Sequence, residues 1–406
     1  MQTKIFFGVT RFSVYAPGNQ AWKLSKDEVS EQAYIQNLYS DERLSTRFDI
    51  FLNRALPIYQ KMSEKHNYRH IVQFSELMPE KWKNKLLKSA EDFPVVLLQK
   101  VANSTASIDA MLGELRRQQC DSSSVVWFRV DDDDILSSDY LDQLERYAIP
   151  EFSGMAVCFG SGITAAYSEG RFHNFRLIRK HFMALGLAYV GRYDAATEKL
   201  VFPKASDHTK TDIHTPVIID SRRPAYLWAH HDSQDTCVDI EKQAATNKID
   251  SLLAALPRIT QPDNFGTVFP TVVDDIRKDA SLGEDIFELD CEIKPGQTPI
   301  HFSCSIPHGW INFEFSIHAE GKGSYNDAII IFEFDGQPPF GEIPGLTKST
   351  NDRIGWYRYL PTTKGISSGG FDIKLPSGVK CTGFRIQAWS CLANSVTLTK
   401  LKIQKM

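Results

Sequence analysis

The sequence has no long apolar run, little net charge and no closely spaced cysteines. No stretch approaches the roughly 18 to 20 apolar residues of a membrane-spanning helix. The first dozen residues contain only a short apolar stretch, which Arg11 interrupts, and so lack the pattern of a signal peptide. A formal charge of −4 gives no general attraction to nucleic acid or to an anionic membrane. We therefore expect no nucleic-acid partner and at most peripheral association with a membrane.

The seven cysteines are scattered without any Cys-x-x-Cys spacing, which excludes a zinc ribbon and a thioredoxin-type motif. Their odd number fits reduced thiols, although one or two disulfides in the last part of the chain remain an alternative. The expected location is the cytoplasm, with the inner face of the membrane as a second possibility. The sequence also lacks internal repeats, a glycine-rich phosphate loop and a second acidic cluster, which argues against a two-metal phosphohydrolase or nucleotidyltransferase.

The length and the pattern of the chain predict two folded domains. A chain of 406 residues exceeds the roughly 250 to 300 residues at which single cores divide. The first part alternates apolar runs with helical periodicity, which is typical of a mostly parallel sheet flanked by helices. The expected strands are 4–9, 69–74, 94–99, 124–130 and 154–160, and the expected helices are 41–65, 103–117 and 139–147.

The pattern changes after Pro262, where proline, glycine, aspartate and threonine become frequent. We expect a first domain at 1–262, a linker at 263–284 and a second domain at 285–406. About eight β runs separated by turn residues predict an all-β sandwich or jelly roll for the second domain. In the run 310–318, apolar residues alternate with polar ones, as in a half-buried strand.

An acidic run, Asp131-Asp132-Asp133-Asp134, follows directly after the apolar, β-rich run 124–130. It is therefore expected at the carboxyl end of a strand, where ligands bind in open α/β sheets. Four adjacent carboxylates repel each other, and a divalent cation with oxygen ligands relieves that repulsion. The alternative is a solvated turn in which an aspartate caps the next helix. The position after a buried strand favours the metal and nucleotide role.

Four sequence segments resemble the bacterial rhamnosyltransferase family. They are GVTRFSV at 8–14, LYSDERLSTRFDIFLNRALPIYQ at 38–60, RHIVQFSELMPEKWKNKL at 69–86 and FRVDDDDIL at 128–136. The segments 207–216 and 225–236 match less closely, and the resemblance ends near residue 240. It implies a GT-A fold and a bacterial glycosyltransferase that uses an Asp-x-Asp metal motif. The expected partners are a nucleotide-sugar donor and an acceptor glycan or glycolipid, and the expected pathway is surface-polysaccharide synthesis.

The resemblance also implies the metal and donor residues. Asp131, Asp133 and His230 would hold Mn2+ or Mg2+, with Asp132 and Asp134 as the alternative register and as donor contacts. His231 is the rival of His230. Further donor-binding candidates are Thr10, Arg11, Arg47 and Arg129. For Arg129 an ion pair with one of the aspartates is the favoured interpretation, and for Arg11 a surface ion pair is the alternative.

A transferase that inverts configuration needs a general base for the acceptor hydroxyl. Asp207 and Asp212 are the candidates by sequence order, with His208 and Lys210 as donor contacts and Asp235 as a third option for the base. Trp228-Ala229-His230 stands where the family pattern has Arg-Gly-His, and 165–204 has no clear match, so the sugar can differ from rhamnose.

Flat aromatic side chains are frequent in the second domain, and they fit either a packed sandwich core or a sugar-binding surface. They are Trp310, Trp356, Tyr357, Tyr359 and Trp389. An alternative to the enzyme is therefore a catalytically inactive protein that binds sugar through this domain.

Overall fold

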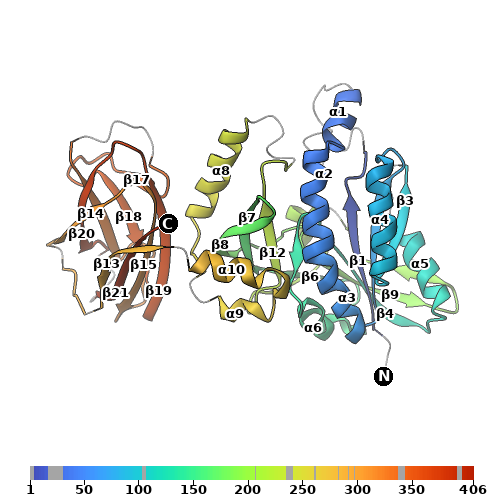
Figure 1. Cartoon of the computed structure of the whole chain (residues 1–406). Coiled ribbons are helices and arrows are strands. Elements are labelled where there is room, and N and C mark those ends of the chain that lie inside the picture. Colours follow the sequence, from blue (N-terminus) through green and yellow to red (C-terminus); the bar gives the residue numbers. More distant parts are fainter. Residues whose placement is uncertain are drawn as a thin grey trace. The chain divides into compact units, whose positions relative to one another are not determined.

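The computed structural model describes most of the chain and divides it into two compact units (Figure 1). The described residues are 4–16, 31–102, 107–205, 207–234, 241–259, 262–281, 283–290, 292–296, 298–336, 343–390 and 396–406. Unit 1 consists of Met1–Thr246 and Gln261–Arg277, and unit 2 consists of Asn247–Thr260 and Lys278–Met406.

Unit 1 is built on a mostly parallel sheet of eight strands, which confirms the predicted α/β class. The strand order is β11-β6-β9-β4-β1-β2-β3, with β10 paired to β9. The pairs β1·β2, β1·β4, β2·β3 and β11·β6 are parallel, and β9 is antiparallel to its neighbours. The bounds are β1 Lys4–Phe12, β2 Tyr68–Ser75, β3 Val96–Val101, β4 Ser123–Arg129, β6 Ala156–Phe159, β9 Ala188–Asp194, β10 Lys199–Val201 and β11 Val217–Asp220.

Helices cover both faces of this sheet because β1 alternates apolar residues between two cores. Ile5, Phe7 and Val9 pack with Met111 and Leu115 of α5. On the other face, Phe12 contacts aromatic rings of the long helical segment 41–65. That segment consists of α2 Asp41–Phe48, a π-helical stretch Asp49–Ala55 and α3 Leu56–Lys65. The other α-helices in the described part of the first 150 residues are α1 Glu31–Leu38, α4 Glu80–Asp92, α5 Ile108–Arg117 and α6 Tyr140–Leu144.

A second, four-stranded sheet of unit 1 has the order β5-β12-β7-β8. Its bounds are β5 Ile135–Leu136, β7 Ser161–Ser168, β8 Arg171–Arg179 and β12 Tyr226–His230. Strand β5 begins one residue after the acidic run and is antiparallel to β12. The remaining α-helices of the described residues are α7 Thr211–His214, α8 Lys242–Ala254, α9 Asp263–Gly266 and α10 Val273–Ala280. None of the helices in the described part of the chain has both the length and the apolar character needed to cross a bilayer.

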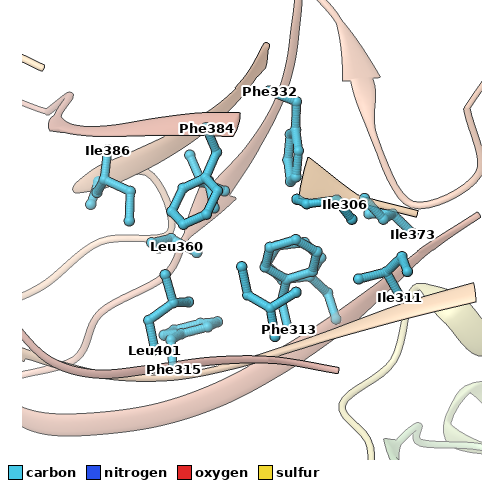
Figure 2. Close-up of a cluster of buried hydrophobic side chains, with 14 of the residues drawn as sticks. Ile306, Ile311, Phe313, Phe315, Phe332, Leu360, Ile373, Phe384, Ile386 and Leu401 are labelled. Atoms are coloured by element: carbon cyan, nitrogen blue, oxygen red, sulfur yellow. The ribbon is translucent and has the colours of Figure 1, made fainter. Parts of the chain in front are cut away.

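Unit 2 consists mainly of two antiparallel sheets, as the sequence predicts. One has the order β13-β21-β15-β19 and the other β14-β20-β16-β18-β17. The bounds are β13 Glu284–Leu289, β14 Ile300–Ile306, β15 Gly309–Ala319, β16 Ala328–Phe334, β17 Thr347–Lys348, β18 Trp356–Leu360, β19 Gly365–Leu375, β20 Cys381–Ala388 and β21 Val396–Lys405. Their facing sides share one apolar core, which includes Ile311, Phe313 and Phe315 of β15 (Figure 2).

The stretch expected as a linker, 263–284, carries α9, α10 and the first residue of β13. Its residues up to Arg277 belong to unit 1, where Thr271 and Asp275 bond with Arg54. Unit 2 in turn includes the earlier segment Asn247–Thr260. Within unit 2, Arg258 of that segment forms ion pairs with Asp279 and Asp372. The proline, glycine, aspartate and threonine residues of 263–284 therefore belong to short helices and the turns between them, and not to an extended linker.

Gly8 allows β1 and β2 to pair closely around a buried histidine. A Cβ at this position would lie 2.4 Å from Nδ1 of His70 and 2.6 Å from the Tyr68 hydroxyl oxygen. Both side chains are buried, so neither can move aside easily. We expect Gly8→Ala to lower the free energy of unfolding by about 1–3 kcal/mol, measured by denaturant titration.

Gly113→Ala is the matched control for Gly8→Ala. Gly113 lies within α5, and a Cβ there would meet no atom within 4 Å. Helix propensity predicts no loss and a gain of up to about 1 kcal/mol. Equal effects of the two substitutions would contradict the steric explanation.

Candidate active site

The candidate site lies where β1 and β4 end side by side. From β1 the chain builds β2 and β3 on one side of the sheet and then returns to β4 on the other side. This reversal of strand order is the topological switch point at which open α/β sheets bind ligands. Val9 pairs with Arg129, so Arg11 near the end of β1 and the acidic run after β4 lie at the same sheet edge.

The pairing of β5 with β12 brings the acidic run to Trp228, His230 and His231. Leu227 pairs with Ile135, directly after the acidic run. The backbone N–H of Ala229 then donates to Oδ1 of Asp134 at 3.0 Å, and Nε2 of His231 lies 3.1 Å from Oδ2 of Asp133. Residues almost 100 positions apart thus form one buried network.

Asp132, Asp133 and Asp134 are buried and bonded to protein groups, with exposed fractions of 3%, 6% and 5%. Arg47 of α2 forms ion pairs with both Asp132 and Asp133, the second at 3.0 Å. Asp132 also accepts from the backbone N–H and the hydroxyl of Ser13, at 3.0 and 3.2 Å. The guanidinium of Arg47 therefore compensates carboxylates that burial would otherwise destabilise.

The charge state of these carboxyl groups differs with their partners. Burial raises the pKa of Asp133, but the charges of Arg47 and His231 and the hydrogen bond with His231 outweigh it and hold the pKa well below its ordinary value. Burial, reinforced by the charge of Asp133, raises the pKa of Asp134 well above its ordinary value. Opposite shifts in adjacent residues show that the four aspartates are not equivalent.

Asp131 is the half-exposed member of the acidic run. Nε and Nη2 of Arg129 donate to its Oδ1 at 3.0 and 2.8 Å, which confirms the predicted ion pair. Burial, followed by the charge of Arg129, lowers the pKa of Arg11 to about 10, and Asp131 partly offsets this shift. Arg11 remains charged at neutral pH. Asp131 is thus bonded to the guanidinium of Arg129 and interacts electrostatically with that of Arg11.

His208 and Lys180 are two further basic residues near Arg11 and Arg129. Burial lowers the pKa of His208, and the charges of Arg129 and Asp131 also act on it. Lys180, which follows β8, places its Nζ 4.8 Å from the centroid of the Trp228 ring. Trp228 contacts the ring of His230 at 4.4 Å between centroids. We call Arg11, Arg129, Lys180 and His208 the basic cluster.

The other predicted residues differ in their burial and in their partners. Asp207 accepts from the backbone N–H and hydroxyl of Thr209 at 3.0 and 2.9 Å, while Lys210 and Asp212 are exposed. The buried Thr10 donates to the carbonyl of Val130 at 2.9 Å and therefore connects β1 to the segment after β4. Asp235 lies outside the described residues.

The described residues include no group of three or more His, Cys, Asp or Glu side chains placed to hold a metal ion. Two features nevertheless fit a cation. Nε2 of His230 is buried and meets no hydrogen-bond partner in the described part of the chain. Burial lowers the pKa of His230 to about 4, so its ring is in the neutral form that binds metals. Asp131 supplies a carboxylate accessible from solvent.

Sequence reasoning missed Lys180 and Trp228 as site residues. Lys180 lies in 165–204, where the family pattern has no clear match, and Trp228 departs from that pattern. No motif marks either residue. The one sequence signal for Trp228 is that it lies two residues before His230, the candidate metal ligand.

The comparisons place unit 1 in a known family. The family model described as "Putative rhamnosyl transferase" matches residues 5–243, which is more than half of the chain. The chain belongs to this family of glycosyltransferases. The match includes the acidic run, the basic cluster and both histidines, and it ends before the β-sheets of unit 2.

No curated protein matches the sequence at a significant level. Among solved structures, the chain is similar to S. aureus TarS 1-349, with 10% identity and a TM-score of 0.26 over 62% of this chain and 64% of that one. The same protein in complex with UDP gives equal values, with 70% of that chain covered. A carbohydrate-binding module from Cellvibrio mixtus lichenase 5A, in complex with cellotriose, has 15% identity and a TM-score of 0.16 over 31% of this chain and 86% of that one.

Proposed function

We propose that this glycosyltransferase takes a sugar from a nucleotide-diphosphate donor bound at the basic cluster and transfers it to a hydroxyl of an acceptor glycan or glycolipid. The observation that carries the proposal is that Arg129 bonds to Asp131 at the switch point, that Arg11 and His208 interact electrostatically with both of these residues, and that Lys180 interacts with His208 and Trp228. These residues come from four separate segments of unit 1. Rhamnose is the sugar that the family name suggests.

A diphosphate suits this cluster for electrostatic reasons. Guanidinium groups donate paired hydrogen bonds to phosphate oxygens, and the ammonium of Lys180 adds a mobile positive charge. When the bond between the sugar and the diphosphate breaks, negative charge grows on the departing phosphate. Fixed cations near that oxygen stabilise the transition state more than the bound donor, which raises the rate.

The same proposal includes Mn2+ or Mg2+ at Asp131 and His230, with Asp133 as a further ligand. Magnesium commonly takes one or two carboxylates from the protein and its other ligands from phosphates and water, so a site without three preformed ligands suits it. When bound, the ion would act as a Lewis acid toward the diphosphate. The residues of the chain hold the donor and orient its phosphates.

For acceptor activation, Asp207 is favoured over Asp212. Asp207 adjoins His208, whose charge interacts with that of Asp131, and so belongs to a segment close to the basic cluster. Asp212 lies on the exposed surface of α7. A carboxylate within hydrogen-bond reach of the acceptor hydroxyl serves as the general base in an inverting reaction. Bacterial surface polysaccharide is the proposed product, made at the cytoplasmic side of the membrane.

Thermal unfolding of the full chain with a panel of UDP-, dTDP- and GDP-sugars, with and without Mn2+, tests this proposal. We expect at least one donor to raise the Tm, because a ligand that binds only the folded state stabilises it. Asp131→Asn should abolish the part of the shift that needs metal, and Lys180→Ala should weaken the whole shift. If no nucleotide sugar raises the Tm, donor binding at the cluster is wrong. If the rise in Tm with the donor is the same in the presence of Mn2+ and in the presence of EDTA, only the proposed metal site is wrong.

A further inference from the structure

Four aromatic side chains of unit 2 gather outside its apolar core. Tyr359 of β18 contacts Tyr325, Tyr357 and Trp389, with ring centroids 5.8, 5.1 and 6.5 Å apart. Tyr325 is 70% exposed and Trp389 is 39% exposed. Tyr357 and Tyr359 are half-buried. A contiguous group of apolar rings at the surface is typical of an interaction site. We call these four residues the aromatic strip.

The strand register shows which face of the sheet the strip occupies. Trp356 and Leu360 of β18 belong to the core between the two sheets. Alternate residues of a strand point to opposite faces, so Tyr357 and Tyr359 point away from that core. On the neighbouring β16 they pair with Ile331 and Ile329, respectively.

The side chains on the outer face therefore form two parallel rows across three strands. One row contains Tyr359, Ile329 and Gln387, and the next contains Tyr357, Ile331 and Arg385. Each row runs from an aromatic ring on β18, over a buried isoleucine on β16, to a polar side chain on β20. The Nη2 of Arg385 donates to the carbonyl of Arg353, and its Nε is buried and has no hydrogen-bond partner among the residues that the structure describes.

A buried aspartate fixes both ends of the strip. Asp327 accepts from the backbone N–H of Ser324 at 2.6 Å and from the hydroxyl of Thr362. Its own carbonyl accepts from the backbone N–H of Trp389 at 2.8 Å. The turn that carries Tyr325 and the segment that carries Trp389 are thus connected to the same residue. This arrangement holds the rings in place before a ligand arrives, which lowers the entropic cost of binding.

The chemistry of the strip matches a chain of pyranose sugars. A sugar ring presents an apolar face of C–H groups and an edge of hydroxyl groups. Aromatic rings bury the apolar face, and phenol, amide and guanidinium groups bond to the hydroxyls. A protein partner would favour a larger apolar centre, whereas here polar side chains lie within each row. The chain belongs to a glycosyltransferase family, so glycans are also the molecules that it handles.

We propose that the aromatic strip of unit 2 is a glycan-binding site, separate from the candidate active site, which holds the acceptor or product polysaccharide by its sugar rings. The proposal does not depend on the donor or metal assignment in unit 1. It assigns Tyr359 as the central contact, Tyr325 and Trp389 as flanking contacts, and Arg385 and Gln387 as hydrogen-bonding groups.

Affinity electrophoresis of the full chain, in gels that contain a soluble rhamnan, a β-glucan or a galactan, tests this site. We expect at least one polysaccharide to slow migration. Tyr359→Ala or Trp389→Ala should raise the apparent Kd by about tenfold or more. Tyr325→Ala should also weaken it, and because Tyr325 is 70% exposed this variant should fold normally. Trp310→Ala is the control, because Trp310 lies on β15 of the other sheet.

The outcomes separate this site from the donor site. Retention in a gel needs no nucleotide sugar, and the Tyr325→Ala variant should keep the donor-induced rise in Tm. The proposal is overturned if no polysaccharide slows the chain or if Trp310→Ala weakens binding as much as Tyr359→Ala. It is also overturned if the chain is oligomeric by size-exclusion chromatography and Tyr325→Ala makes it monomeric, since the strip would then bind a second copy.

Discussion

Replacing Arg47 with alanine is expected to lower the free energy of unfolding by about 3–5 kcal/mol, as is typical when one partner of a buried ion pair is removed. Arg47 is the shared partner of Asp132 and Asp133, and all three side chains are less than a tenth exposed. Without the guanidinium, two adjacent carboxylates remain in a desolvated site, with Ser13 and His231 as partners. Denaturant titration followed by circular dichroism measures the loss.

A surface ion pair provides the control for Arg47→Ala. Arg116 and Glu198 form a bridge of 2.7 Å in which both side chains are 54% exposed. Arg116→Ala should change the free energy of unfolding by no more than about 1 kcal/mol. The double variant with Arg47→Ala and Asp132→Asn should recover part of the lost stability, since it removes one of the uncompensated charges. A loss for Arg47→Ala no greater than that for Arg116→Ala would show that the network is not a stabilising one.

Replacing Asp131 with asparagine is expected to lower kcat/KM for the nucleotide-sugar donor by about 10²–10³-fold, the range for loss of one electrostatic contact to a transition state. The substitution keeps the shape of the side chain and removes the charge that Arg129 binds and that a cation would need. Asp131 is half exposed, so the fold should tolerate the change. Initial rates with a labelled donor, together with the unchanged Tm of the variant without ligand, measure the effect.

Asp194→Asn is the matched control for Asp131→Asn. Asp194 also accepts two local hydrogen bonds, from the backbone N–H of Ala196 and the hydroxyl of Thr197, but it ends β9 far along the chain from the acidic run. Its replacement should leave kcat/KM within about twofold, as expected for a surface substitution. Full activity of the Asp131→Asn enzyme would show that this carboxylate takes no part in catalysis, and Asp133 and His231 would then be the next candidates.

Local patterns were sufficient to predict the sheet edge that carries the site. The strands that become β1 and β4 begin as continuous apolar runs, as buried parallel strands do, and the polar residues at and just after their carboxyl ends must meet at one edge. For this reason Arg11, Arg129 and Asp131 could be proposed from the sequence. The β runs of unit 2 were equally clear because turn residues separate them.

Other features depend on contacts between segments distant in sequence. The two residues of β5 carry no strand pattern and become a strand through their pairing with β12. That pairing brings His231 to Asp133, a contact that residue spacing cannot predict. Lys180 reaches Trp228 only because β8 and β12 lie on either side of β7 in one sheet. The aromatic strip depends in the same way on the register of β16 with β18 and β20.

The interleaved course of the chain between the two units restricts how the protein can be divided for expression. A C-terminal fragment that starts at Lys278 would leave out Arg258, the ion-pair partner of Asp279 and Asp372. An N-terminal fragment that stops at Thr246 would leave out Thr271 and Asp275, the partners of Arg54 in unit 1. A single cut anywhere between these positions removes part of at least one unit. Fragments that fold faithfully would need an engineered connection in place of the excised segment.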